Sequence, residues 1–203
     1  MEVWAGMIVG FDHDDESVFA AQRQFLAAAR ISTAMVGMIS AIPKTPLHER
    51  LAAAGRLDPA DDPPAGTNVL PLRMSREELS QGYVRLMTEL YEADAYFDRL
   101  DDLYIAGGIE TERAWQRYAR AHPWRRRGYQ LQLLAQAAGV ALRLMWRVPD
   151  PTLRRTYRQR LRQVWRRRGD PVVLRIYAVK CAMHYHVHRL VQQQRSGTLV
   201  NTY

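Results

Sequence analysis

The sequence predicts a short α/β segment followed by a mostly α-helical domain. Two continuous apolar runs, at residues 3–10 and 33–39, are typical of strands that are buried on both faces in a parallel sheet. Between them, over residues 16–29, apolar residues recur at three- and four-residue spacing, as they do along the buried stripe of a helix. From residue 75 onward almost every segment has this helical spacing, which predicts a helical second half.

The composition is that of a folded chain with an excess of positive charge. Of the 203 residues, 47% are hydrophobic, which is enough to bury a core and argues against wholesale disorder. The single cysteine excludes a disulfide framework and is typical of a reducing compartment. The sequence shows no secretory leader and no apolar run of membrane-spanning length, so we expect a cytoplasmic protein. The net charge of +8 comes mainly from arginines in the C-terminal half.

The first strand is followed by a turn at residues 10–12 and then by a helix. Asp14 and Asp15 are suitable N-caps for this helix, and Glu16 suits the positive end of its dipole. Together with Asp12 these carboxylates also resemble a cation loop, but they lack the glycine and the terminal glutamate of an EF-hand. We therefore interpret them as helix caps. A strand–helix–strand unit of this size must pair its strands in parallel, with a right-handed crossover.

A short helix is predicted after the second strand. Thr45 is suitable as its N-cap, Pro46 as its first residue, and Gly55 as the residue just past its end. Lys44 comes at the C-terminal end of the strand, where the sites of barrel enzymes gather, and it could meet a carboxylate or a phosphate there. We favour the interpretation that it is an exposed loop lysine.

The domain boundary is predicted in an irregular stretch over residues 56–72, which is rich in aspartate, proline and glycine. The expected organisation is an α/β piece over residues 1–57, a linker over 58–74 and a helical domain over 75–203. Ser75 and Glu78 form a capping box that starts the first helix of this domain. Further helices are expected over residues 92–102, 112–121 (ending at His122-Pro123), 129–147, 152–168 and 172–194.

The opening residues resemble a known family. Gly6-Met7-Ile8-Val9-Gly10 is similar to the G-x-I-x-G segment at the fifth strand of radical S-adenosylmethionine (SAM) enzymes. Residues 34–47 resemble the sixth strand and its Pro-Gly-Thr-Pro-Leu turn, with Lys44 in the place of the glycine. The ordered set of motifs is most similar to the cobalamin-binding branch that includes hopanoid methylase-like proteins with a C-terminal helical domain of unknown function. The α/β piece would then be part of a TIM-like radical SAM barrel.

This resemblance implies cofactors that the chain cannot hold alone. The intact relatives would use SAM, a [4Fe–4S] cluster and, in this branch, cobalamin; Gly6, Ile8 and Gly10 would lie beside SAM, with Ile8 against its adenine. The cluster needs three thiolates from a C-x3-C-x2-C loop, whereas this chain has only Cys181. We therefore expect a C-terminal fragment that is inactive by itself, binds none of these cofactors alone and has the missing N-terminal radical SAM portion or a neighbouring polypeptide as its partner. A truncated gene and a misassigned start codon both remain open.

Three histidines, His184, His186 and His188, follow Cys181 closely and raise the question of a metal site. On a helix His184 and His188 share a face, whereas His186 points elsewhere. A metal site needs a third ligand and supporting hydrogen bonds, which we do not find in the sequence. We interpret the histidines as partly buried packing residues beside Tyr185.

The basic C-terminal half also supports a second class of function, that of a binding module. The predicted helix over residues 152–168 is two-faced and rich in arginine, and it would place Trp165 at the surface of an anionic membrane or against a protein partner. A solvated arginine-rich surface is the simpler interpretation of the same residues. The sequence has no base-reading motif, so we expect no specific nucleic acid partner. The expected location is the cytoplasm, including the inner face of the membrane.

Overall fold

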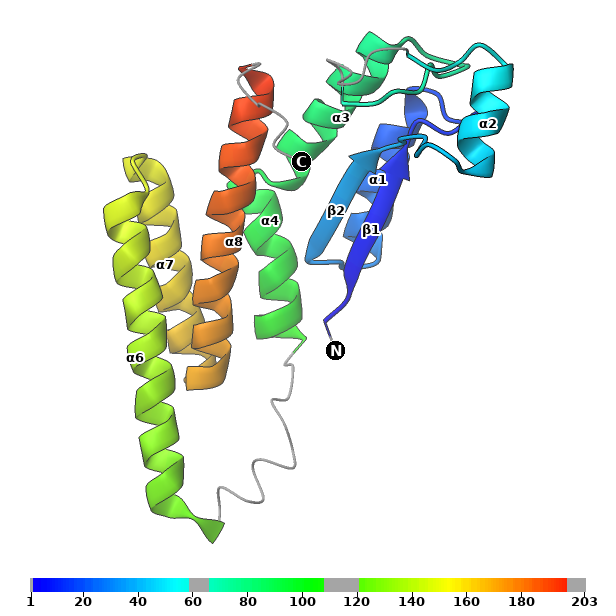
Figure 1. Cartoon of the computed structure of the whole chain (residues 1–203). Helices are drawn as coiled ribbons and strands as arrows, with labels where there is room; N and C mark the ends of the chain where they lie inside the picture. The colour runs from blue at the N-terminus through cyan, green and yellow to red at the C-terminus, as the bar shows by residue number, and fades with distance from the viewer. Residues whose placement is uncertain (1, 59–65, 108–120, 197–203) are drawn as a thin grey trace. The chain divides into compact units, whose positions relative to one another are not determined.

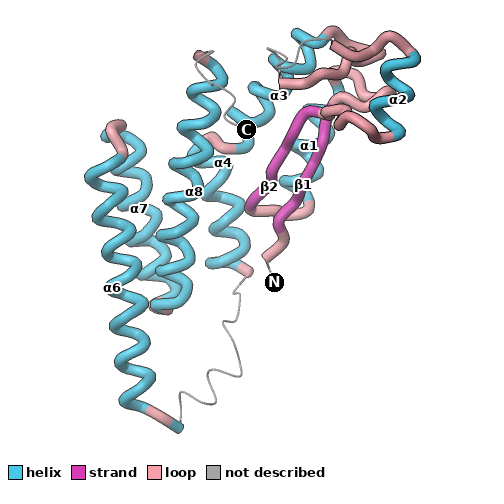
Figure 2. The backbone as a smooth tube through the Cα atoms, in the orientation of Figure 1, coloured by secondary structure: helices cyan, strands magenta, loops and turns pink. Residues whose placement is uncertain are grey.

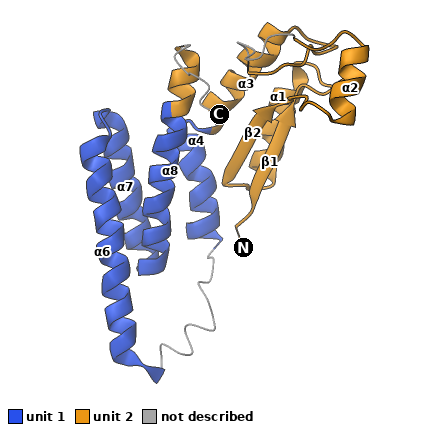
Figure 3. Cartoon of the chain, in the orientation of Figure 1, with its two compact units in different colours: residues 1, 91–189 blue, residues 2–90, 190–203 orange. Residues whose placement is uncertain are grey.

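The computed structural model describes residues 2–58, 66–107 and 121–196 (Figure 1). It contains a two-stranded parallel sheet with helices at the N-terminal end and then a mostly helical region, as the sequence predicted (Figure 2). The chain divides into two compact units (Figure 3). The helical unit spans Tyr91–Arg189, and the sheet unit combines Glu2–Leu90 with the end of the chain from Leu190. The domain boundaries placed at residues 57 and 75 stay predictions.

The sheet unit begins with the predicted strand–helix–strand motif. Strands β1 (Trp4–Val9) and β2 (Thr33–Met38) pair in parallel, and α1 (Ser17–Ala28) connects them. In Figure 1 this helix lies behind the two strands. The prediction that the strands are buried on both faces was wrong, because one face of the sheet is covered while the other carries exposed apolar side chains.

The covered side of the sheet unit is closely packed. Phe19 and Leu26 of α1 are buried, and α1 contacts α3 (Arg76–Leu90). A Cβ atom added to Gly82 of α3 would lie only 2.1 Å from the ring of Phe19. Glycine is therefore the residue that allows these two helices to approach each other.

The turn after β1 is held by a carboxylate that the sequence predicted to be a cap of the helix. The side chain of Asp14 accepts hydrogen bonds from the backbone N–H groups of Gly10 (2.9 Å) and Phe11 (3.0 Å), so it closes the loop and does not cap α1. Asp15 accepts from the N–H of Ser17, the first residue of α1, at 2.9 Å, but the N-cap residue is Glu16, whose side chain makes no capping bond. Neither aspartate is therefore the N-cap residue that the sequence predicted, since an aspartate also suits the turn that precedes a helix.

Two further helix starts follow their sequence signals. Helix α2 (Pro46–Ala53) begins at its proline, and the hydroxyl of Thr45 accepts from the N–H of His48 at 3.3 Å. Gly55, just past its end, has a φ of +64°. In the capping box of α3, the carboxylate of Glu78 accepts from the N–H of Ser75 (2.6 Å), and the Ser75 hydroxyl accepts from the N–H of Glu78 (3.1 Å).

The helical unit contains α4, η1, α6, α7 and most of α8. Helix α4 (Ala93–Asp101) runs directly into η1 (Asp102–Ala106), a π-helical turn that ends before Gly107. They are followed by α6 (Pro123–Arg147), α7 (Pro151–Arg168) and α8 (Pro171–Arg195). The helix predicted over residues 112–121 lies almost wholly outside the described residues.

The start of α6 corrects a prediction. We expected Pro123 to end one helix and residue 129 to start the next, but α6 already begins at Pro123. Proline ends a helix that precedes it, yet it also suits the first position of a new one, where no backbone N–H is needed. The sequence pattern does not distinguish the two roles.

Candidate functional site

The face of the sheet opposite α1 is an open apolar surface. Trp4, Ile8 and Met35 lie on it, and their exposed fractions range from 50% to 70%. Gly6 lies opposite Met35 in the strand register, and a Cβ atom added to Gly6 would meet no atom within 4 Å. The structure therefore places the predicted SAM-proximal residues Gly6 and Ile8 on one accessible, flat face, with room for a planar group against it. Their contact with SAM stays a prediction.

The backbone of β1 is held from the covered side. Gln22 of α1 is buried, and its side-chain amide donates to the carbonyl oxygen of Ile8 at 3.1 Å. This hydrogen bond joins the connecting helix to the strand and fixes the main chain at Ile8. The side chain of Ile8 faces the open surface.

Gly10 ends β1 and has a clear structural requirement. Its φ of +103° favours glycine, and an added Cβ atom would lie 2.9 Å from Cδ2 of Leu79 and 3.0 Å from Cγ2 of Ile39. The glycine is thus required for the turn and for the packing of α3 beneath it. This requirement is independent of any role toward a cofactor.

Polar side chains organise the loops at the carboxyl end of the two strands. Asp12, in the loop after β1, accepts from Arg50 of α2 at 2.5 Å and from Arg56 at 2.8 Å. These two hydrogen bonds lower the pKa of the Asp12 carboxyl, so the group stays ionised. The bond from Arg50 has the larger effect and the bond from Arg56 the next largest. Asp12 thereby ties the loop after β1 to the elements that follow β2.

The loop after β2 is fastened by a side chain that imitates a neighbouring strand. The amide group of Asn68 accepts from the N–H of Ala41 and donates to its carbonyl oxygen, both at 2.8 Å. The hydroxyl of Thr67 donates to the carbonyl of Ile39 at 2.5 Å. Lys44 lies in this loop with a φ of +67°, a backbone conformation that favours glycine.

In the helical unit His184 lies at the centre of an aromatic core. It is fully buried, with ring centroids 5.0 Å from Tyr96 and 5.3 Å from Phe97. Its Nε2 atom is 3.0 Å from the carbonyl oxygen of Tyr91, and its Nδ1 atom is 2.7 Å from the hydroxyl of Tyr157. Because a carbonyl oxygen only accepts, Nε2 carries the proton and Nδ1 accepts from Tyr157. Burial lowers the pKa of His184 to about 4, so the ring is neutral.

The neighbouring histidines do not build a site around it. His188 is partly buried and stacks on His184 with 5.9 Å between ring centroids, whereas His186 is exposed. Cys181 is fully buried, and burial raises the pKa of its thiol. Within the described ranges, no three histidine, cysteine or acidic side chains come together in a way that would hold a metal ion. The packing interpretation is therefore confirmed for His184, while the prediction that His186 is partly buried was wrong.

A second polar network joins α4, α7 and α8. Asp101 accepts from the hydroxyl of Tyr177 at 2.5 Å and from Arg160 at 2.9 Å. Arg160 also pairs with Asp94 and Asp98, both at 3.1 Å. Burial, reinforced by the bond to Asp101, raises the pKa of Tyr177 and keeps its hydroxyl protonated as a donor. These groups are committed to one another, and the network fixes the three helices.

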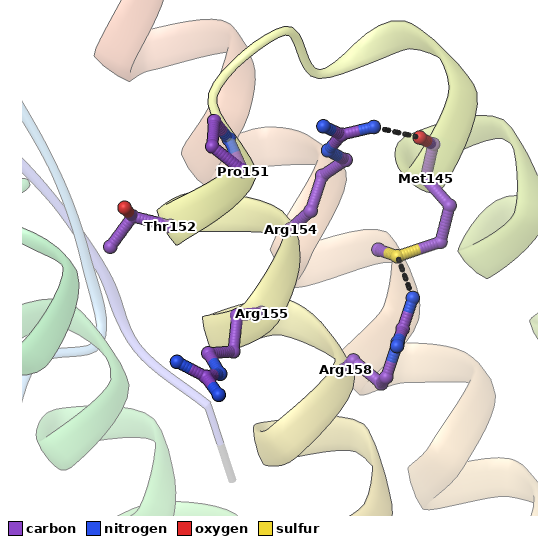
Figure 4. A pocket seen from close by; sticks show the side chains of 6 residues that line it. All are labelled: Met145, Pro151, Thr152, Arg154, Arg155 and Arg158. Atoms are coloured by element: carbon purple, nitrogen blue, oxygen red, sulfur yellow. Dashed lines mark hydrogen bonds between the residues drawn. The ribbon is translucent and has the colours of Figure 1, made fainter.

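A pocket of about 460 Å³ opens between the C-terminal part of α6 and the N-terminal part of α7 (Figure 4). Arg154 donates to the carbonyl oxygen of Met145 at 3.4 Å, and Arg158 lies 3.9 Å from the Met145 sulfur, while Arg155 points away from them. The remaining lining residues are Pro151 and Thr152. Sequence reasoning missed this pocket because it depends on the α6–α7 pairing, although three arginines within five residues were a visible signal.

Comparisons with known proteins relate this chain to a described family, mainly through the residues that follow the two strands. The model of a family described as a domain of unknown function (DUF4070) matches residues 45–198. The hopanoid C-2 methylase of Rhodopseudomonas palustris (strain TIE-1) is 28% identical over 101 residues, which cover 50% of this chain and 19% of that protein. The match thus spans about a fifth of that relative's length. No solved structure matches the chain.

Proposed function

We propose that this chain, which belongs to the family described as a domain of unknown function (DUF4070), forms the C-terminal part of a radical SAM enzyme. In this proposal the sheet unit supplies a section of the barrel wall, and the helical unit covers or shapes the substrate site. The similarity of a limited stretch to a hopanoid C-2 methylase supports an apolar lipid as the substrate class.

The open apolar face of the β1–β2 pair is the observation that carries this proposal. In a TIM-like barrel, helices cover the outer face of each strand, apolar side chains of the inner face fill the interior, and the reacting molecules bind at the carboxyl ends of the strands. The pair has this division, with α1 on one face and Ile8 and Met35 on the uncovered face. Asp12 and Asn68 organise the loops at the carboxyl ends. Two parallel strands with such a face are a poor sheet by themselves.

The residues present do not fit the iron–sulfur cluster. A cluster requires several cysteine thiolates, whereas Cys181 is the single cysteine, fully buried and with a raised thiol pKa. The proposal therefore assigns the cluster to another part of the enzyme. Gly6 and Ile8 fit a contact with the adenine of SAM, since the face they share is open and apolar.

Two experiments test the proposal. The nucleotide sequence upstream should encode a C-x3-C-x2-C segment, either in frame with this chain or in a neighbouring reading frame. Absence of such a segment would overturn the proposal.

The second experiment uses the purified chain, reconstituted anaerobically with iron and sulfide and then given SAM and a reductant. We expect no stoichiometric cluster and no release of 5′-deoxyadenosine until the polypeptide that contains the three cysteines is added. Cluster uptake with 5′-deoxyadenosine release by this chain alone would contradict the assignment.

A further inference from the structure

Helix α6 has an apolar stripe on the side that faces away from the core of the helical unit. Leu133, Ala137 and Leu144 are its buried residues. On the opposite side, Trp124, Leu131, Leu142 and Trp146 are between 61% and 84% exposed. We call these four residues the α6 stripe. They recur at positions that share one face of the helix, and exposed Ala135 and Gly139 continue this face between them.

The α6 stripe extends along almost the whole helix. Its 25 residues span about 37 Å at the rise of an α-helix. A surface helix normally has charged or polar residues on its solvent side, so four large apolar side chains there indicate an interaction surface. This stripe lies within a single unit of the chain.

The surroundings of the α6 stripe are strongly basic. Between residues 123 and 195 the sequence contains 17 lysines and arginines but only two acidic residues, Asp150 and Asp170. Both aspartates are used as helix caps, accepting from the N–H groups of Thr152 (2.7 Å) and Val172 (2.8 Å). Helix α7, which packs beside α6, presents an exposed row of arginines, namely Arg155, Arg158, Arg162 and Arg166.

The pocket of Figure 4 lies at the C-terminal end of α6, where the α6 stripe also ends. Met145, which lines the pocket, precedes Trp146 of the stripe in the sequence. Arg154, Arg155 and Arg158 line this pocket, with Arg154 and Arg158 directed toward Met145, and none of the lining residues is acidic. The pocket is therefore complementary in charge to a phosphate group.

We propose that the α6 stripe docks on an anionic lipid bilayer, with the stripe in the boundary between head groups and acyl chains. The arginines of α7 and of the pocket then contact lipid phosphates. A helix binds such a surface when its apolar face includes tryptophan and arginines lie beside that face. The buried apolar area and the positive charge both contribute to this binding. No described helix is long and apolar enough to cross a membrane, so α6 lies on the bilayer.

Other occupants fit the surface less well. A second copy of the chain would bring two arginine-rich surfaces together, which like-charge repulsion opposes. A nucleic acid would use the arginines but would give no role to Leu131 and Leu142. An anionic bilayer uses both kinds of residue. The inference does not depend on the radical chemistry proposed above.

Co-sedimentation of the full chain with vesicles tests this proposal. We expect binding to vesicles of equal parts phosphatidylglycerol and phosphatidylcholine, little binding to phosphatidylcholine alone, and loss of binding as salt is raised from about 0.1 M to about 1 M. Equal binding to both vesicles, or no binding to either, would overturn the proposal. A dimer in sedimentation velocity that is lost in L142S would instead identify a second copy as the occupant.

Variants separate the apolar contribution from the charge. The double variant L142S/W146S should weaken partitioning about tenfold, whereas the exposed Phe25→Ser, in the other unit, should leave it unchanged. The triple variant R155Q/R162Q/R166Q should weaken it about a hundredfold, since each arginine near an anionic surface contributes about fivefold. Its control, R23Q/R73Q/R85Q, removes three charges from the sheet unit. Equal effects of the two triple variants would show a general charge effect and overturn the assigned site.

A second readout locates the stripe in the bilayer directly. Lipids brominated in the acyl chain should quench the tryptophan fluorescence of the bound protein, and Trp146→Phe should reduce this quenching. Trp4 lies in the sheet unit, so Trp4→Phe should leave the quenching unchanged. Far-ultraviolet circular dichroism should remain unchanged in all variants, because the substituted side chains are exposed. Quenching that persists fully in both Trp146→Phe and Trp124→Phe would contradict the proposal.

Discussion

At the scale of single residues, His184 shows how a buried polar ring is kept neutral. Both ring nitrogens have a fixed partner, one an oxygen that accepts and the other a hydroxyl that donates. A proton on Nδ1 would break the bond from Tyr157 and place a charge among Tyr96 and Phe97. His188 and Arg99 also lie near enough to disfavour that charge. The histidine therefore acts as a part of the core.

The first prediction concerns the pH dependence of stability. The pKa of His184 falls from its ordinary value of 6.5 to about 4 on folding, so the unfolded chain binds the proton more readily. Its contribution to the free energy of unfolding is complete above pH 6.5 and is lost as the pH falls toward 4, by about 3 kcal/mol. Urea unfolding of the helical unit at several pH values measures this loss. The control variant H186Q, at an exposed position, should show the same decrease in the free energy of unfolding with falling pH. A free energy of unfolding that stays constant between pH 6.5 and 4 would contradict the prediction.

A second prediction concerns Lys44, whose φ of +67° is unfavourable for a branched side chain. We expect Lys44→Val to lower the free energy of unfolding of the sheet unit by about 1–2 kcal/mol. Lys44→Gly should cause no loss, because glycine adopts this conformation without strain. Chemical denaturation of both variants measures the difference. Equal stabilities would show that the loop relaxes to another conformation.

At the scale of elements, local signals were read correctly wherever one residue type has one role. The capping box of Ser75 and Glu78 and the proline start of α2 are complete within four residues, so the sequence predicts them. Asp14 and Pro123 each suit two neighbouring roles, and only the packed structure selects one. The burial of a strand depends on which elements cover it, and for this reason the open face at Ile8 could not be predicted.

A third prediction tests the close approach of α1 and α3. Gly82→Ala places a Cβ atom 2.1 Å from the ring of Phe19, so the helices must separate and the sheet unit should lose about 1–3 kcal/mol. Gly128→Ala in α6 is the matched control, because its added Cβ atom meets nothing within 4 Å. That control should gain about 0.5–1 kcal/mol from its lower backbone entropy in the unfolded chain. Denaturant titration, which monitors the unfolding of each unit, distinguishes the two variants.

At the scale of the whole molecule, the two units have different characters. The sheet unit contains the motifs on which the family resemblance was based, and the helical unit contains most of the basic surface. Composition predicted this asymmetry in charge. The α6 stripe was not predicted, because Leu131, Leu142 and Trp146 look like core residues until the opposite face of α6 is known to be the buried one.

A fourth prediction tests the open face of the sheet in the proposed radical SAM enzyme. When the cluster-containing polypeptide is present, Ile8→Asp should weaken SAM binding about tenfold, because it places a carboxylate on the apolar face proposed to meet the adenine. Phe25→Asp, an exposed apolar residue of α1, is the control and should bind SAM normally. Equilibrium dialysis with labelled SAM measures both. An unchanged affinity in Ile8→Asp would place the cofactor elsewhere.

The two-stranded sheet has a consequence for the isolated polypeptide. Among the described residues β1 and β2 pair only with each other, so each has an outer edge beside which no further described strand lies. Such edges, next to a flat apolar face with Trp4 and Met35, are templates for strand addition by another molecule. At high concentration the purified chain should form thioflavin-positive assemblies through these edges. Proline substitutions at the strand edges, which block backbone pairing, should delay their appearance.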